Sequence, residues 1–69
     1  MIEVFKTNVE NHDTASTICS NICRRPGISS ATFDLDDCDR ILRVEGADFD
    51  SHQIKSLVEK MGYECEVLI

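Results

Sequence analysis

The sequence predicts an α+β fold in which two helices cover one face of a four-stranded antiparallel sheet. Three observations predict it. Two segments carry apolar residues at helical spacing, four segments alternate apolar and polar residues, and together they follow the order β-α-β-β-α-β. Sixty-nine residues are enough for one small domain, so we expect residues 1–69 to form a single domain.

The first predicted strand covers residues 2–9, which are rich in β-branched and aromatic side chains. Their partial alternation predicts that Phe5, Thr7 and Val9 share one face of the strand. The polar residues 10–13 follow, and their asparagine and aspartate side chains are candidates for a helix N-cap.

From Thr14 the apolar spacing becomes that of a helix, which ends at Pro26-Gly27. The apolar stripe consists of Ala15, Ile18, Cys19, Ile22 and Cys23. Cysteine is often buried as a small hydrophobic residue, so we expect Cys19 and Cys23 to point into the core. The alternative is that the two thiolates, which share a helical face, bind a soft metal.

Residues 31–35 and 42–45 alternate like strands and predict a hairpin around the turn Asp36-Asp37-Cys38-Asp39. Its aspartates resemble a calcium loop at first sight, but the glycine and distal glutamate of an EF-hand are missing. A polar hairpin turn is the simpler interpretation. Cys38 should be exposed there, which makes it the best candidate for a reactive thiol.

The second predicted helix has Asp50 as its N-cap and Gly62 at the position that follows its last turn. Its apolar stripe consists of Ile54, Leu57, Val58 and Met61. His52 should be exposed in its first turn. Residues 63–67 alternate again and predict a last strand in which Cys65 points into the core. The complete order is that of a ferredoxin-like βαββαβ sandwich.

The chain resembles the heavy-metal-associated domain of copper chaperones and copper-pumping ATPases over nearly its whole length. The resemblance rests on five segments in the right order: Phe5-Lys6-Thr7-Asn8-Val9, Pro26-Gly27-Ile28, Phe33-Asp34-Leu35, Arg40-Ile41-Leu42-Arg43-Val44-Glu45-Gly46 and Met61-Gly62-Tyr63. It implies a role in metal handling. It also places Tyr63 beside the metal loop, near His12, whereas the residues alone favour Tyr63 as an aromatic side chain that closes the core.

The family's metal motif, Met-x-Cys-x-x-Cys, is missing from this chain. By helix phase, the Met position falls on Val9 and the two Cys positions fall on Asn11 and Thr14. A slip of one residue would place the cysteines on Glu10 and Asp13 instead. Either alignment leaves no thiolate, and Cu(I) selects thiolate or thioether ligands. We therefore expect no copper-chaperone activity at this loop.

The residues in the motif's place, Asn11-His12-Asp13-Thr14, form a degenerate candidate metal loop. The imidazole of His12 and the carboxylate of Asp13, with Glu10 beside them, are ligands for a borderline metal such as Zn²⁺ or Ni²⁺. The alternative is a solvated loop that caps the first helix, where the helix dipole favours Asp13.

The net charge of −6 makes nucleic acid and anionic membrane surfaces unfavourable partners, whereas a basic protein or a cation would be attracted. The sequence has no apolar run of about 18 residues and no signal-peptide pattern at Met1–Lys6, so we expect a cytoplasmic protein with reduced thiols. We expect a monomer or a weak homodimer.

No nucleophile–base pair, phosphate loop or pair of catalytic carboxylates occurs at a recognisable spacing, so we expect no enzyme. The first functional hypothesis is a metal-binding or metal-trafficking domain whose degenerate loop binds a borderline metal weakly or not at all. The second is a metal-independent protein–protein interaction module. Apolar residues on the open sheet face, such as Ile2, Val4 and Ile41, would serve the second.

Overall fold

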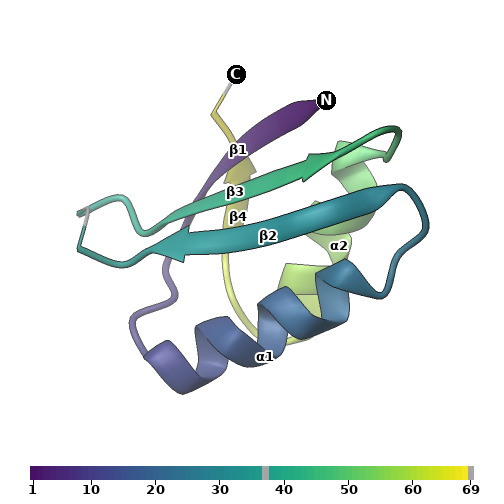
Figure 1. Cartoon of the computed structure of the whole chain (residues 1–69). Helices are drawn as coiled ribbons and strands as arrows, with labels where there is room; N and C mark the ends of the chain where they lie inside the picture. Colours follow the sequence, from purple (N-terminus) through teal and green to yellow (C-terminus); the bar gives the residue numbers. More distant parts are fainter. Residues whose placement is uncertain (37, 69) are drawn as a thin grey trace.

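The computed structural model describes residues 1–36 and 38–68, so Asp37 of the predicted turn and Ile69 lie outside the described residues. The elements follow the predicted order (Figure 1). They are β1 (Ile2–Thr7), α1 (His12–Cys23), β2 (Ile28–Asp34), β3 (Ile41–Gly46), α2 (Ser51–Lys60) and β4 (Cys65–Val67).

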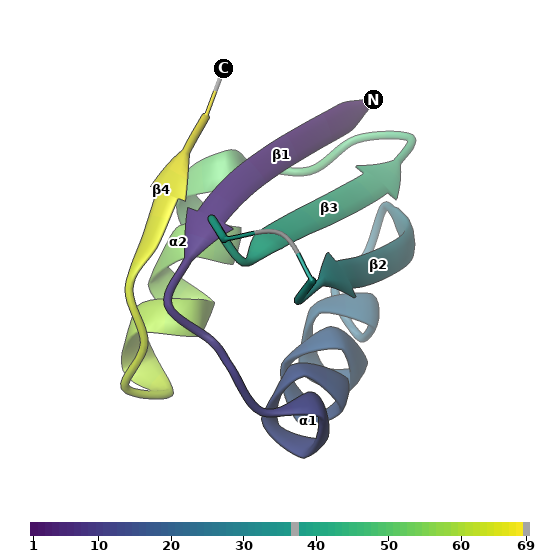
Figure 2. The ribbon, with the colours of Figure 1, turned by 90° about the vertical axis from the view of Figure 1, so that its left-hand side faces the viewer.

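The four strands form one antiparallel sheet in the order β2-β3-β1-β4. Figure 2 shows both helices on the same face of the sheet, with the other face left open. Helix α1 packs against β2, and α2 packs against β4. The predicted ferredoxin-like sandwich is therefore confirmed.

The core lies between the sheet and the two helices. Phe5, Thr7 and Val9 are all buried in it, as their alternation predicted, and Cys65 is only 1% exposed. The buried apolar side chains are Phe5, Val9, Ala15, Ile18, Ile22, Leu42, Val44, Ile54, Val58 and Cys65.

Element boundaries differ from the predictions by a few residues. Strand β1 ends at Thr7 rather than at residue 9, and α1 begins at His12 rather than at Thr14. The first two residues of α1, His12 and Asp13, are exposed and polar, so they carry no apolar period that would reveal a helix. Strand β2 begins early, at Ile28, and β4 is only three residues long.

The predicted burial of Cys23 is wrong. Cys23 is exposed, and Cys19 is only partly buried. Each residue of an α-helix turns the side chain by about 100°, and Ile18 and Ile22 occupy the centre of the buried line of α1. Each cysteine directly follows one of these isoleucines, so both lie on the flank of the helix. Cys23 is also the last helical residue.

The end of the molecule where α1 leads into β2 depends on two glycines. Gly27 has a φ of 85°, and its carbonyl oxygen accepts a hydrogen bond from the Ala47 N–H at 2.8 Å. A Cβ at Gly27 would clash with the Asp48 carbonyl, and one at Gly46 would clash with the Gly27 carbonyl. The connection from α1 to β2 and the connection from β3 to α2 therefore pack backbone against backbone, which only glycine permits here.

Candidate metal-binding loop

The loop between β1 and α1 ends at Asn11, which caps the helix. The Asn11 Oδ1 accepts hydrogen bonds from the backbone N–H groups of Asp13 at 2.7 Å and Thr14 at 3.2 Å. Its backbone carbonyl accepts the first helical bond, from the Ala15 N–H at 2.9 Å. The amide oxygen that stands at the first Cys position is therefore engaged by the backbone.

His12 and Asp13 occupy the exposed first turn of α1, and Thr14 is partly buried. Asp13 lies at the positive end of the helix dipole, which favours its carboxylate. Among residues 1–36 and 38–68, no group of three or more His, Cys, Asp or Glu side chains is placed to hold a metal ion. The predicted loop residues are thus adjacent in sequence without forming a ligand cluster.

A polar network that the sequence did not reveal lies behind the loop. The hydroxyl of Thr7 donates to the carbonyl of Arg40 at 2.6 Å and accepts from the Val9 N–H at 3.3 Å. The Thr7 N–H donates to the Asp39 carbonyl at 3.2 Å, and the Arg40 guanidinium lies 3.8 Å from the Glu10 carboxylate. These contacts join the loop to the connection between β2 and β3. The partners lie about 30 residues apart, and no local pattern predicts such a pairing.

A second link joins the loop to the connection between α2 and β4. The side-chain amide of Asn8 donates to the Glu64 carboxylate at 3.1 Å, and its oxygen accepts from the Glu64 N–H at 2.8 Å. A pocket of about 210 Å³ adjoins this pair and is lined by Lys6, Thr7, Asn8, Glu64 and Glu66. Tyr63, one residue before the link, packs against the core, as the residue-based interpretation predicted.

All four cysteines are free, and they lie outside the loop. Cys38 is exposed, as expected. Burial raises the pKa of the Cys65 thiol to about 11, with the Glu59 carboxylate as a second cause. Burial, and then the nearby Cys23 thiolate, raise the pKa of Cys19.

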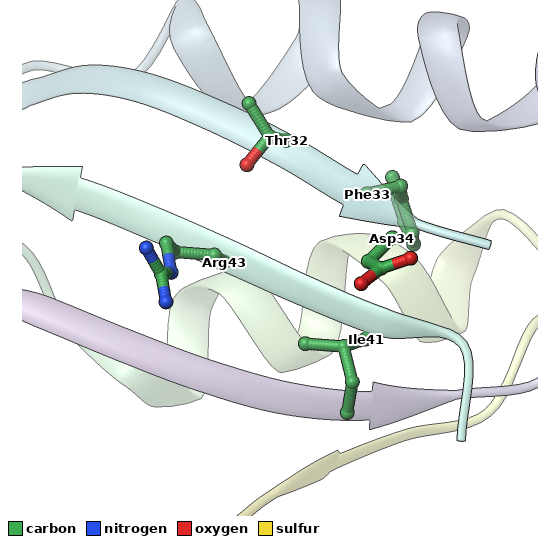
Figure 3. A pocket seen from close by; sticks show the side chains of 5 residues that line it. All are labelled: Thr32, Phe33, Asp34, Ile41 and Arg43. Carbon is green, nitrogen blue, oxygen red and sulfur yellow. The ribbon is translucent and has the colours of Figure 1, made fainter. Parts of the chain in front are cut away.

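A pocket of about 310 Å³ lies on the open face of the sheet (Figure 3). Thr32, Phe33, Asp34, Ile41 and Arg43 line it. This lining supplies one carboxylate and one guanidinium but no imidazole or thiol, so it is not a transition-metal site.

His52 is exposed in the first turn of α2, as expected.

Solved structures with the same architecture cover nearly all of this chain. A CopZ metallochaperone superposes with a TM-score of 0.83 at 19% identity, covering 94% of this chain and 98% of its own. The yeast copper transporter domain Ccc2a, known in apo and Cu(I)-loaded states, gives a TM-score of 0.88 at 17% identity and covers 99% and 94%. This chain has the fold of copper-handling domains.

The N-terminal domain of PacS from Synechocystis PCC6803 extends the comparison, with a TM-score of 0.77, 16% identity and coverage of 100% and 98%. No protein-family model and no curated protein sequence matches the chain. The resemblance in the sequence is thus confirmed at the level of the fold. In the part of the chain that the structure describes, neither helix is long and apolar enough to cross a membrane.

Proposed function

We propose that residues 1–69 form a single heavy-metal-associated domain of the metal-ion binding and trafficking class, with a loop that no longer binds Cu(I). The observation that carries this proposal is the match to copper-handling domains over nearly the full length of both chains. The metal motif of the family falls on Asn11 and Thr14, at the start of α1, where this chain offers no sulfur.

The loop's chemistry favours a borderline divalent ion, Zn²⁺ or Ni²⁺, bound weakly. His12 supplies the only nitrogen donor of the loop's side chains that suits such an ion, and Asp13 supplies a carboxylate. Asn11 is engaged in the helix cap, and Glu10 is paired with Arg40. Two ligands fall short of the four of a structural zinc site, so affinity at this loop is low.

The net charge of −6 favours a basic protein as partner over nucleic acid or an anionic membrane. We place the protein in the cytoplasm, without enzymatic activity, as a monomer or a weak homodimer. A reducing compartment would keep its four free thiols reduced.

A titration of the reduced, metal-free protein with Zn²⁺ and Ni²⁺ tests the loop. The α1 thiols Cys19 and Cys23 also suit Zn²⁺, so the test is made in a Cys19→Ser and Cys23→Ser background, which serves as the parent. We expect weak binding by this parent and by His52→Ala, which removes the other exposed histidine, and no binding by His12→Ala. Calorimetry or competition with a chromogenic chelator measures the metal affinity of each protein. Equal binding by parent and His12→Ala would rule out the loop site.

The second candidate, a metal-independent interaction module, is favoured by one observation. Ile2 in β1 and Leu68, which directly follows β4, are 57% and 46% exposed, and the Leu68 N–H donates a hydrogen bond to the Val4 carbonyl at 2.9 Å. A parent protein that binds none of Zn²⁺, Ni²⁺ and Cu(I) would favour this candidate over the first.

A further inference from the structure

Two thiols lie one helical turn apart on α1, outside the loop. Cys19 and Cys23 are both free; Cys23 is exposed and Cys19 is partly buried. Their spacing of four residues places them on one face of the helix. Because Cys23 does not belong to the core, burial does not explain why α1 carries two cysteines at this spacing.

The spacing suits a metal bridge within one helix. Side chains four residues apart have Cβ atoms about 5–6 Å apart. Two bonds of the length of a zinc–thiolate bond, about 2.3 Å, span about 4.6 Å in a linear arrangement, which flexible cysteine side chains can match. Histidines at the same spacing hold zinc on the helix of metalloproteases.

The charges around the pair also favour a bound cation. Two thiolates one helical turn apart repel each other, and a cation bound between them replaces this repulsion by attraction.

We propose that Cys19 and Cys23 form a two-thiolate site for Cu(I) on the flank of α1. Both thiols lose a proton on binding, copper enters as Cu(I), and no electron is transferred. Cu(I) is soft and selects thiolates. The described residues place no group of three His, Cys, Asp or Glu ligands together, so the pair does not complete the four-ligand set of structural zinc.

The pair is accessible from the side of α1 that faces away from α2. Asn21 contacts Met61, which directly follows α2, with 3.7 Å between its amide nitrogen and the Met61 sulfur. Around the helix axis, residues 19 and 23 each lie about 160° from residue 21, one on either side. Both therefore point roughly away from α2. Figure 1 shows α2 behind α1.

Cu(I) titration of the reduced protein under anaerobic conditions, against a chromogenic Cu(I) chelator, tests the site. We expect one Cu(I) per chain for the parent and loss of that binding in Cys23→Ser and in Cys19→Ser. Cys38→Ser is the matched control, because it removes an exposed thiol from elsewhere and should keep the copper. Since Cys23 is exposed, Cys23→Ser should retain the parent's circular dichroism spectrum and melting temperature.

Native mass spectrometry of the same samples gives the stoichiometry. A chain of 7.8 kDa that carries one copper supports the site. Copper that bridges two chains, or that survives in Cys23→Ser, would overturn it. The inference is separate from the proposed function, since His12→Ala should leave Cu(I) binding unchanged, and Zn²⁺ binding that remains in Cys19→Ser/Cys23→Ser and is lost with His12→Ala belongs to the loop.

Discussion

The Thr7 hydroxyl donates a hydrogen bond to the backbone carbonyl of Arg40 at 2.6 Å. Arg40 has a φ of 49°, a left-handed conformation that is uncommon for a residue other than glycine. Thr7 thus holds an unusual backbone conformation in place directly behind the loop. Because Thr7 is only 7% exposed, water does not readily replace this bond.

We expect Thr7→Val to lower the free energy of unfolding by about 1–3 kcal/mol, because it removes the hydroxyl that donates to the Arg40 carbonyl and accepts from the buried Val9 N–H. Urea denaturation measures the change. Thr32→Val, at an exposed position of β2, is the control and should change stability little. Equal effects of the two substitutions would mean that the Thr7 bonds do not stabilise the fold.

Asn11→Ala should lower the free energy of unfolding by about 1 kcal/mol, since it removes the acceptor for two backbone N–H groups. Asn11→Asp keeps an acceptor and should retain the parent's stability. Thermal melting compares them, with Ser16→Ala in the exposed part of α1 as the control. A neutral Asn11→Ala would show that the cap contributes little.

The double change Asn11→Cys and Thr14→Cys should create a Cu(I) site in the loop. The positive end of the α1 dipole lowers thiol pKa values there, and two thiolates supply the ligands that Cu(I) selects. Glu10 and Asp13 should weaken the site by repelling the thiolates.

The change is best made in a Cys19→Ser and Cys23→Ser background, so that the α1 pair does not contribute. Anaerobic Cu(I) titration then compares this protein with its background. If the double change adds no Cu(I) binding, the alignment of the family motif on Asn11 and Thr14 is wrong, or the chain is unrelated to the family.

Stability should fall with rising pH in the window set by Cys65. An unfolded thiol titrates near 9.0, whereas burial raises the pKa in the folded chain to about 11. Between these values the folded chain keeps a proton that the unfolded chain releases, so the free energy of unfolding decreases as pH rises from 9.0 to about 11. Below pH 9.0 both states hold the proton, and Cys65 adds no pH dependence.

Urea denaturation across this range measures the slope for the parent, Cys65→Ala and Cys38→Ala. Cys65→Ala should be less stable at neutral pH and should show a shallower decline. Cys38→Ala should follow the parent, since that thiol is exposed. Parallel curves for the parent and Cys65→Ala would show that Cys65 does not govern the slope.

The sequence predicted the order and type of the elements because apolar periods reflect burial, and burial here follows the sheet and helix faces closely. Phe5, Ile18 and Ile54 are all inside, as their spacing required. The burial of Cys23 was wrongly predicted because the apolar stripe of five residues is broader than the part of α1 that the sheet covers. The helical spacing of apolar residues does not show how far that covered part extends.

The surroundings of the loop could be predicted less well. That residues 10–13 would cap the helix was expected, but Asn11 was one of several candidates. The bonds from Thr7 to Arg40 and from Asn8 to Glu64 join residues 33 and 56 positions apart. They depend on how the connections meet after folding, which no local pattern contains.

The length of α1 has a consequence for metal occupancy. Cys19 and Cys23 lie eight and twelve residues beyond Asn11, which places them about 12–18 Å along the helix axis from the loop. The Debye length at physiological ionic strength is only about 8 Å. An ion at either place should therefore hardly change affinity at the other, and the two isotherms should add without cooperativity.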